Sequence, residues 1–225
     1  MAATPDRHAD NDSAPDNRIL LARFVRVMDF AARMHAPQRR KTGNTPYIVH
    51  PIGVAHIIAN EGGVCEYDVL ELALLHDMVE DTPTTLDDIE REFGADMRAL
   101  VAEVSDNKDD SKVARKRAQI EHVAHASRTA RIVKLADKIY NLRDLIREPP
   151  SAWSIGRVQG YFAWSHAVYT AGLRGTCPAL DAVFEELMTA RFRMADGTEH
   201  PVLRPNVPIE EQVGAYYALL DGMHD

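Results

Sequence analysis

Apolar residues recur with helical spacing along most of this chain, and this pattern is the strongest constraint on its fold. Near the N-terminus, Leu20, Leu21, Phe24, Met28 and Ala31 follow one another mainly at intervals of three and four residues, which places them on one helix face. Similar patterns continue to about residue 193, without a strand-like alternation of useful length and without an internal repeat. The sequence therefore predicts an all-α fold.

Glycine, proline and capping residues divide this pattern into roughly ten helices. Pro51 suits the first position of a helix that Gly62 and Gly63 close. Thr85 and Asp88 resemble a capping box at the start of another helix. Helices are expected at residues 18–36, 51–61, 67–79, 86–93, 96–104, 112–125, 129–147, 155–173, 178–193 and 209–221.

Three segments differ in composition. Residues 1–17 are polar and rich in Asp, Asn, Ala and Pro, which predicts a disordered N-terminal tail. Residues 18–193 carry the helical pattern and are expected to form one domain, as suits a chain of 225 residues. Residues 194–225 begin with a stretch rich in glycine and proline, and we expect them to form a C-terminal extension that holds the last short helix.

The composition argues against several classes of protein. Lys and Arg number 26 against 34 Asp and Glu, and the net charge of −8 argues against a nucleic-acid partner, a membrane-surface helix and, taken alone, an anionic substrate. No apolar run approaches the roughly 18 residues of a membrane span, and the N-terminus has no signal-peptide core. Cys65 and Cys177 are too few for a disulfide framework, so we expect two small buried residues in a cytoplasmic protein.

The run LALLHDMVEDT concentrates ionisable groups at the end of an apolar helix. His76 and Asp77 are adjacent, and Glu80 and Asp81 follow one turn later. Burying these groups beside leucines is costly unless something compensates for their charge. A divalent cation would compensate, because imidazole nitrogen and carboxylate oxygen are common metal ligands. A His–Asp pair alone is weak support, since histidine is also a frequent core residue.

Two further segments strengthen the prediction of a metal site. His50 stands directly before Pro51, where a helix is expected to begin. The run RIVKLADKIYNLRDL carries a polar stripe, Lys134, Asp137, Lys138 and Asn141, on an otherwise apolar helix. Such a stripe on a lone helix would be a solvated face with intrahelical ion pairs. Here the flanking apolar residues leave little surface for water, so the stripe needs buried partners.

Three runs, HAPQRRKTGNTPYIVHP, ALLHDMVEDTPTTLDDIEREFG and VKLADKIYNLRDL, occur in the order found in a known family. Over roughly residues 20–193 the chain resembles the HD-domain hydrolases of the RelA/SpoT group, and most closely their small stand-alone forms. The resemblance implies an HD-domain helical bundle around one metal site. It also implies hydrolysis of the 3′-pyrophosphate of the guanosine alarmones ppGpp and pppGpp, with ppGpp giving GDP and pyrophosphate, and one manganese ion, Mn²⁺, per chain. No synthetase domain fits in this length.

The resemblance implies a role for each residue that matches a family position. Four residues would bind the metal: His50, His76, Asp77 and Asp137. The catalytic pair that orients and deprotonates the attacking water would be Glu80 and Asp81. Substrate-binding positions are matched by Arg40, Lys41, Asn141, Lys112, Arg157 and Tyr161.

Several other prominent residues are interpreted as structural. The histidines outside the ligand set are expected in the core, near the ligands or on a solvated helix: His35, His56, His122 and His125. Core positions are expected for the aromatic residues Trp153, Phe162 and Trp164. A surface face with one or two members turned inward is expected for the basic cluster Lys112, Arg115, Lys116 and Arg117.

Two alternatives to ppGpp hydrolysis stay open. Stand-alone relatives also include enzymes that remove the 2′-phosphate of NADPH, and the motifs do not separate these substrates. The chain could instead be a nucleotide- or partner-binding module in which residues 194–225 are functional and the HD core is a relic. No expected ligand or catalytic carboxylate is missing, which argues against that module. Assembly into a homo-oligomer is also left open.

Overall fold

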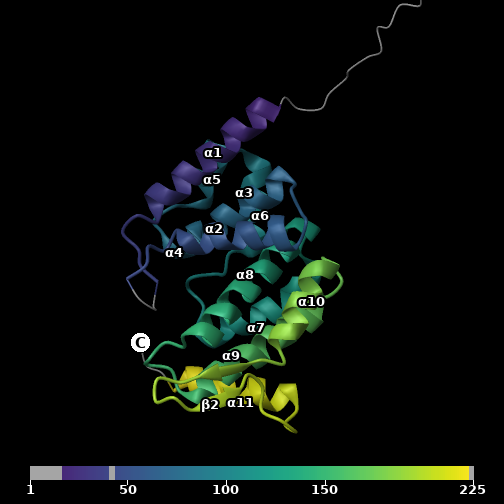
Figure 1. Ribbon diagram of the computed structural model, residues 1–225. Helices are drawn as coiled ribbons and strands as arrows, with labels where there is room; N and C mark the ends of the chain where they lie inside the picture. The colour runs from purple at the N-terminus through teal and green to yellow at the C-terminus, as the bar shows by residue number, and fades with distance from the viewer. Residues whose placement is uncertain (1–16, 41–43, 223–225) are drawn as a thin grey trace, which may run out of the picture.

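The computed structural model describes residues 17–40 and 44–222 of the chain (Figure 1). Its helices are α1 (Asn17–Met34), α2 (Val49–His56), α3 (Tyr67–Leu75), α4 (Met78–Asp81), α5 (Leu86–Phe93), α6 (Ala95–Val104), α7 (Lys112–His122), α8 (Arg128–Arg147), α9 (Ile155–Val168), α10 (Pro178–Leu187) and α11 (Ile209–Asp221). Short π- or 3₁₀-helical turns extend α2, α7 and α9 over Ile57–Glu61, Val123–His125 and Tyr169–Leu173. The predicted all-α class is confirmed.

A short antiparallel hairpin interrupts the helical order after α10. Its strands are β1 (Arg191–Arg193) and β2 (Glu199–Pro201), with Phe192 opposite His200. The expectation of a helix over 178–193 was wrong beyond Leu187, and no strand signal is visible there in the sequence because three-residue strands are too short for an alternating pattern to show. The hairpin buries Phe192 and the following Val202 against the helical core.

The long helix α8 runs through the middle of the molecule and packs against α2, α3, α6, α9 and α10 (Figure 1). Its apolar residues Ile132, Leu135, Ile139 and Leu142 are completely buried, and Lys138 is buried with them. A helix covered on most of its faces can present polar side chains at low cost only to a polar cavity or to charged partners. The polar stripe of α8 therefore requires such a cavity beside it.

The helix expected at 67–79 is divided into α3 and α4 at His76 and Asp77. Asp77 has φ −95° and ψ 0°, a conformation in which an α-helix does not continue. The interruption turns the Asp77 carboxylate toward α2, where its Oδ2 lies 3.3 Å from His50 Nε2. The expectation of one continuous helix was wrong, and the break brings adjacent polar residues to one point.

Two further expectations were wrong in detail. α2 begins at Val49, so Pro51 is its third residue rather than its first. Proline is tolerated there because the N–H groups of a first helical turn have no intrahelical partner. Cys65 is exposed, whereas Cys177 is buried as expected.

The last helix, α11, packs against α9 at the end of the molecule away from α1 (Figure 1). The approach is close, because a Cβ at Gly160 of α9 would lie only 2.6 Å from the Tyr216 ring. Gln212 holds the preceding loop, accepting the N–H of Arg204 at 2.9 Å and donating to the carbonyl of Val207 at 2.8 Å. Residues 201–222 are thus packed onto the helical body.

None of the helices in the described ranges is long and apolar enough to cross a membrane. Of the predicted N-terminal tail, residues 1–16 lie outside the described residues, and Asn17 already begins α1. Lys41, one of the predicted substrate-binding residues, also lies outside them.

Candidate metal centre and substrate cavity

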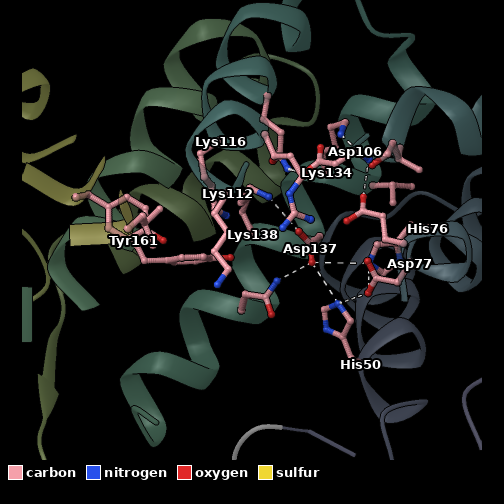
Figure 2. A pocket seen from close by; sticks show the side chains of 18 of the residues that line it. His50, His76, Asp77, Asp106, Lys112, Lys116, Lys134, Asp137, Lys138 and Tyr161 are labelled. Atoms are coloured by element: carbon pink, nitrogen blue, oxygen red, sulfur yellow. Dashed lines mark hydrogen bonds and ion pairs between the residues drawn. The ribbon is translucent and has the colours of Figure 1, made fainter. Parts of the chain in front are cut away.

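His50, His76 and Asp137 come from α2, the end of α3 and α8, and their ligand atoms all lie within 4.8 Å of one another. Asp77 joins them, with Oδ2 3.3 Å from His50 Nε2 and 3.1 Å from His76 Nε2. The structure thus brings together the four predicted metal ligands, as Figure 2 shows. We call these four residues the His–Asp cluster.

The hydrogen bonding of His76 fits a cation at this point. Its Nδ1–H donates to the carbonyl of Ala73 at 2.7 Å, which leaves Nε2 as the nitrogen with a free lone pair. That Nε2 is buried without a hydrogen-bond donor and faces the oxygens of Asp77 and Asp137 at 3.1 and 3.8 Å. Three acceptors that face one another need a positive charge between them, and a divalent metal ion supplies it.

The pKa values in the cluster show the same demand for positive charge. Burial would raise the pKa of Asp77, but positive charge at the His76 and His50 imidazoles holds it well below its usual value, and a bound cation would supply that charge when the rings are neutral. Burial would likewise raise the pKa of Asp137, and Lys138 and the imidazoles lower it well below normal. Both carboxylates are therefore ionised. Charges of this kind suit a divalent cation.

Neighbouring side chains orient the carboxylates. The Tyr47 hydroxyl donates to Asp77 Oδ2 at 2.7 Å. Asn141, one turn after Asp137, donates through Nδ2 to Asp137 Oδ1 at 2.7 Å, and Lys138 Nζ lies 3.1 Å from Asp137 Oδ2. Such outer contacts fix the direction in which a ligand oxygen points.

Glu80 lies beside the cluster, in the single helical turn α4 that follows the break. Its Oε1 accepts the backbone N–H of Asp106 at 2.7 Å. Burial, together with the negative charge of Asp106, raises the pKa of Glu80 to about 7. A carboxylate with this pKa exchanges protons readily near neutral pH.

Asp81 lies on the exposed side of the same turn, and its carbonyl accepts a hydrogen bond from the Gln38 side chain. Partial burial and the charge of Asp77 raise the pKa of its carboxyl group. Asp81 lines a neighbouring cavity rather than the one that holds Glu80. The two acidic residues of the predicted catalytic pair therefore face different spaces.

A cavity of about 310 Å³ opens from the His–Asp cluster toward α7, α9 and α11 (Figure 2). Among the described residues, six cationic side chains line it: Lys112, Arg115, Lys116, Lys134, Lys138 and Arg157. We call this set the cationic lining. It suits a ligand with several negative charges.

The structure brings most of the predicted substrate-binding residues to this cavity: Asn141, Lys112, Arg157 and Tyr161. Arg40 lines an adjoining cavity of about 290 Å³, which shares Tyr47, Asn141 and Tyr161 with the first. There Arg40 pairs with Asp144 at 2.5 Å. The predicted substrate-binding residues are thus shared between the first cavity, which is strongly cationic, and the adjoining cavity, which is more aromatic.

The sequence analysis underestimated the basic residues of α7. Lys112, Arg115 and Lys116 all line the cavity, whereas one or two inward residues were expected. Lys116 is held inside by stacking over the Trp164 ring at 3.3 Å, and burial, with the charge of Lys138, lowers its pKa to about 7. The four-residue spacing of Lys112 and Lys116 was the available signal, because it places both on one helix face.

The structure places several residues elsewhere than expected or in roles that were not foreseen. Trp153 packs against the core but is only half-buried and also lines the cavity, whereas Phe162 and Trp164 are completely buried as expected. His35 is buried beside Tyr47, apart from the metal ligands. Exposed positions are occupied by His56, His122 and His125. Cavity residues with no predicted role are Tyr47, Asp106, Gln119, Tyr216 and Leu220.

Several known proteins are similar in sequence to this chain. The family model described as the HD domain matches residues 28–158. Human guanosine-3′,5′-bis(diphosphate) 3′-pyrophosphohydrolase MESH1 is 52% identical over 171 residues, which are 76% of this chain and 95% of the human protein. The MESH1 protein of Xenopus tropicalis is 51% identical over 167 residues, 74% of this chain and 93% of that protein.

A solved structure agrees with these sequences. It is described as a metazoan orthologue of SpoT that hydrolyses ppGpp and plays a role in starvation responses. It aligns with a TM-score of 0.72 and 41% identity, covering 78% of this chain and 96% of its own. The chain therefore belongs to the HD domain family, in the group that contains these metazoan SpoT relatives.

Proposed function

We propose that this protein hydrolyses ppGpp to GDP and pyrophosphate. The observation that carries the proposal is the position of the His–Asp cluster at one end of a cavity with six cationic side chains. A site for a bis-diphosphate nucleotide needs both a place for the reacting phosphate and cations for the remaining phosphate oxygens. The metazoan relatives that match this chain carry the name of this activity.

His50, His76, Asp77 and Asp137 would hold one divalent ion, which we propose to be Mn²⁺. When bound, such an ion polarises a phosphate oxygen and lowers the pKa of bound water. The two carboxylates are ligands suited to Mn²⁺, and imidazole is a common ligand of divalent transition metals. Tyr47 and Asn141 would keep the carboxylates in place through the hydrogen bonds described above.

Glu80 would take the proton of the attacking water. Its Oε1 accepts the Asp106 N–H, so Oε2 is the oxygen that receives the proton. The water oxygen then adds to the phosphorus attached to the 3′ oxygen, and the bond between that phosphorus and the 3′ oxygen breaks. The 3′ oxygen takes up the proton from Glu80 to become the hydroxyl of GDP, and GDP and pyrophosphate leave. Asp81, which faces the adjoining cavity, would act from the far side of the turn by relaying protons.

The two adjoining cavities would bind different parts of the nucleotide. The phosphates would lie along the cationic lining, because six basic side chains face that space. The guanosine would lie in the adjoining cavity, where the guanidinium of Arg40 is 5.5 Å from the ring centres of Tyr47 and Tyr140. A planar guanidinium and aromatic rings suit a nucleobase.

Pyrophosphate release from ppGpp tests this function. The purified chain loaded with Mn²⁺ is expected to release one pyrophosphate for each GDP formed, and the Asp77→Ala variant is expected to lose both the metal and the activity. Metal content and product are measured on the same sample. A metal-loaded wild-type chain that forms neither product would overturn the proposal.

A further inference from the structure

α11 borders the candidate catalytic cavity although it lies outside residues 28–158, which the HD domain model matches. Tyr216 and Leu220 line the same cavity as His50 and Asp137, and they are only 2% and 5% exposed. The human relative is matched over 95% of its length by 76% of this chain. α11 therefore adds a wall to the cavity from a part of the chain beyond the HD domain match.

This wall borders the cationic lining. Burial, and to a smaller extent the nearby Tyr161, raises the pKa of the Tyr216 hydroxyl. The positive charges of Arg157 and Lys138 oppose this rise, so both lie close enough to Tyr216 to affect it. Arg157 and Lys138 both line the cavity. The side chains of Tyr216 and Leu220 thus border the space that the phosphates of a bound nucleotide would occupy.

The packing of α11 holds this wall close to α9. Gly160 leaves no room for a Cβ, which would meet Cδ2, Cβ and Cγ of Tyr216 at 2.6 to 2.8 Å. Gln212 fixes the loop before α11 through three hydrogen bonds to Arg204 and Val207. Retreat of the wall would break these contacts, so a larger ligand could not displace it without cost.

The substrate has two diphosphates, and only one of them reacts. With the 3′ diphosphate at the His–Asp cluster and the guanosine beside Arg40, the 5′ diphosphate needs cations of its own. Lys112, Lys116 and Arg157 of the cationic lining supply them. The end of the 5′ diphosphate would then meet the wall that Tyr216 forms.

We propose, on the basis of the function proposed above, that Tyr216 and Leu220 close the cavity around the 5′ diphosphate and exclude nucleotides that carry a bulky group on it. NADPH is such a nucleotide, because its 5′ diphosphate is joined to a second nucleoside while its 2′-phosphate is the group that would react. Tyr216 and Leu220 are therefore specificity-determining residues that favour ppGpp over NADPH.

The test compares both nucleotides on full-length variants. Tyr216→Ala removes the wall, Tyr216→Phe keeps its ring, and Tyr217→Ala makes the same truncation at the next residue, whose ring lies 5.1 Å from the Arg117 guanidinium and lines an outer groove. The quantity measured is kcat/KM for phosphate release from NADPH divided by kcat/KM for pyrophosphate release from ppGpp. This ratio does not depend on the fraction of active protein.

The ratio is expected to rise about ten-fold or more in Tyr216→Ala, which is the scale of steric discrimination in a packed pocket. It should stay within about two-fold of wild type in Tyr216→Phe and Tyr217→Ala. If Tyr216→Ala does not fold, Leu220→Ala opens the same wall from the next turn. An unchanged ratio in the folded variant, or a wild-type chain that prefers NADPH, would overturn the proposal.

Calorimetry with GDP and NADP⁺ in the Glu80→Gln background separates this proposal from the proposed function, because without the proton acceptor neither ligand is turned over. The measured quantity is the affinity for GDP divided by the affinity for NADP⁺. If this ratio falls in Tyr216→Ala but the wild-type chain does not hydrolyse ppGpp, the proposed function is overturned and the role of α11 stands. Hydrolysis of ppGpp with an affinity ratio that is the same in all variants would overturn the role of α11 alone.

Discussion

Glu80 is the residue whose chemistry the structure defines most sharply. Glu80→Gln keeps the size of the side chain and its hydrogen bond from Asp106, but it removes the proton acceptor. We expect kcat to fall by roughly 10²- to 10⁴-fold, the usual contribution of a general base, while metal binding stays intact. Pyrophosphate release and metal content measure the two effects. The opposite result, lost metal with normal turnover per bound metal, would assign Glu80 to the metal site instead.

The pKa of Glu80 also predicts a pH dependence. Burial and the charge of Asp106 raise this pKa to about 7, and only the ionised carboxylate accepts a proton. In the metal-loaded enzyme the positive charge of the ion lowers this pKa, so kcat should rise with pH and level off at or below about 7. Asp106→Asn removes the negative neighbour, so the rise should move to lower pH. A profile that is the same in wild type and Asp106→Asn would contradict this origin.

At the scale of elements, the contact between α9 and α11 depends on one glycine. Gly160→Ala would place a Cβ 2.6 Å from the Tyr216 ring, and we expect a loss of roughly 1–3 kcal/mol in the free energy of unfolding through overpacking. Gly156→Ala is the matched control on the same helix, because its Cβ would meet Leu219 at an ordinary 3.5 Å. Urea unfolding measures both variants. Equal free energies of unfolding for Gly160→Ala and Gly156→Ala would mean that α11 can shift away from α9 at little cost.

Helices that depend on neighbours in the sequence were predictable. The capping box at the start of α5 forms as expected, with the Asp88 N–H donating to Thr85 Oγ1 at 3.1 Å and the Thr85 N–H to Asp88 Oδ2 at 3.0 Å. Contacts within one helical turn need no knowledge of the rest of the chain. The break at Asp77 was not predictable in this way, because Asp77 turns toward His50 of α2 and toward Tyr47 in the loop before it, which are distant in the sequence.

The candidate site shows the same division. The polar stripe of α8 was found from its spacing, and the prediction that it needs buried partners holds in the structure. The inward position of Lys116 depends on its contact with Trp164, which is 48 residues away in the sequence. Local periodicity cannot predict a contact between residues so far apart. Tyr216 was missed for a similar reason, since only the packing of α11 onto α9 brings it to the cavity.

At the scale of the whole molecule, the net charge of −8 misled the first inference about the substrate. Folding gathers six basic side chains at one cavity, where they outnumber the four acidic ones, Asp77, Glu80, Asp106 and Asp137. A local field of this kind, rather than the total charge, determines which ligand binds. An anionic nucleotide is therefore compatible with an acidic protein.

The His–Asp cluster also joins parts of the chain that are far apart, so metal binding should stabilise the whole fold. A ligand that binds only the folded state at 100 times its Kd adds about 2.7 kcal/mol, or roughly 5 to 10 °C in Tm for a chain of this size. We expect a chelator to lower Tm by this amount in wild type and in Glu80→Gln, which keeps the four ligands. Asp137→Asn should show little change, because its metal site is already lost. Equal shifts in Asp137→Asn and wild type would place the stabilising metal elsewhere.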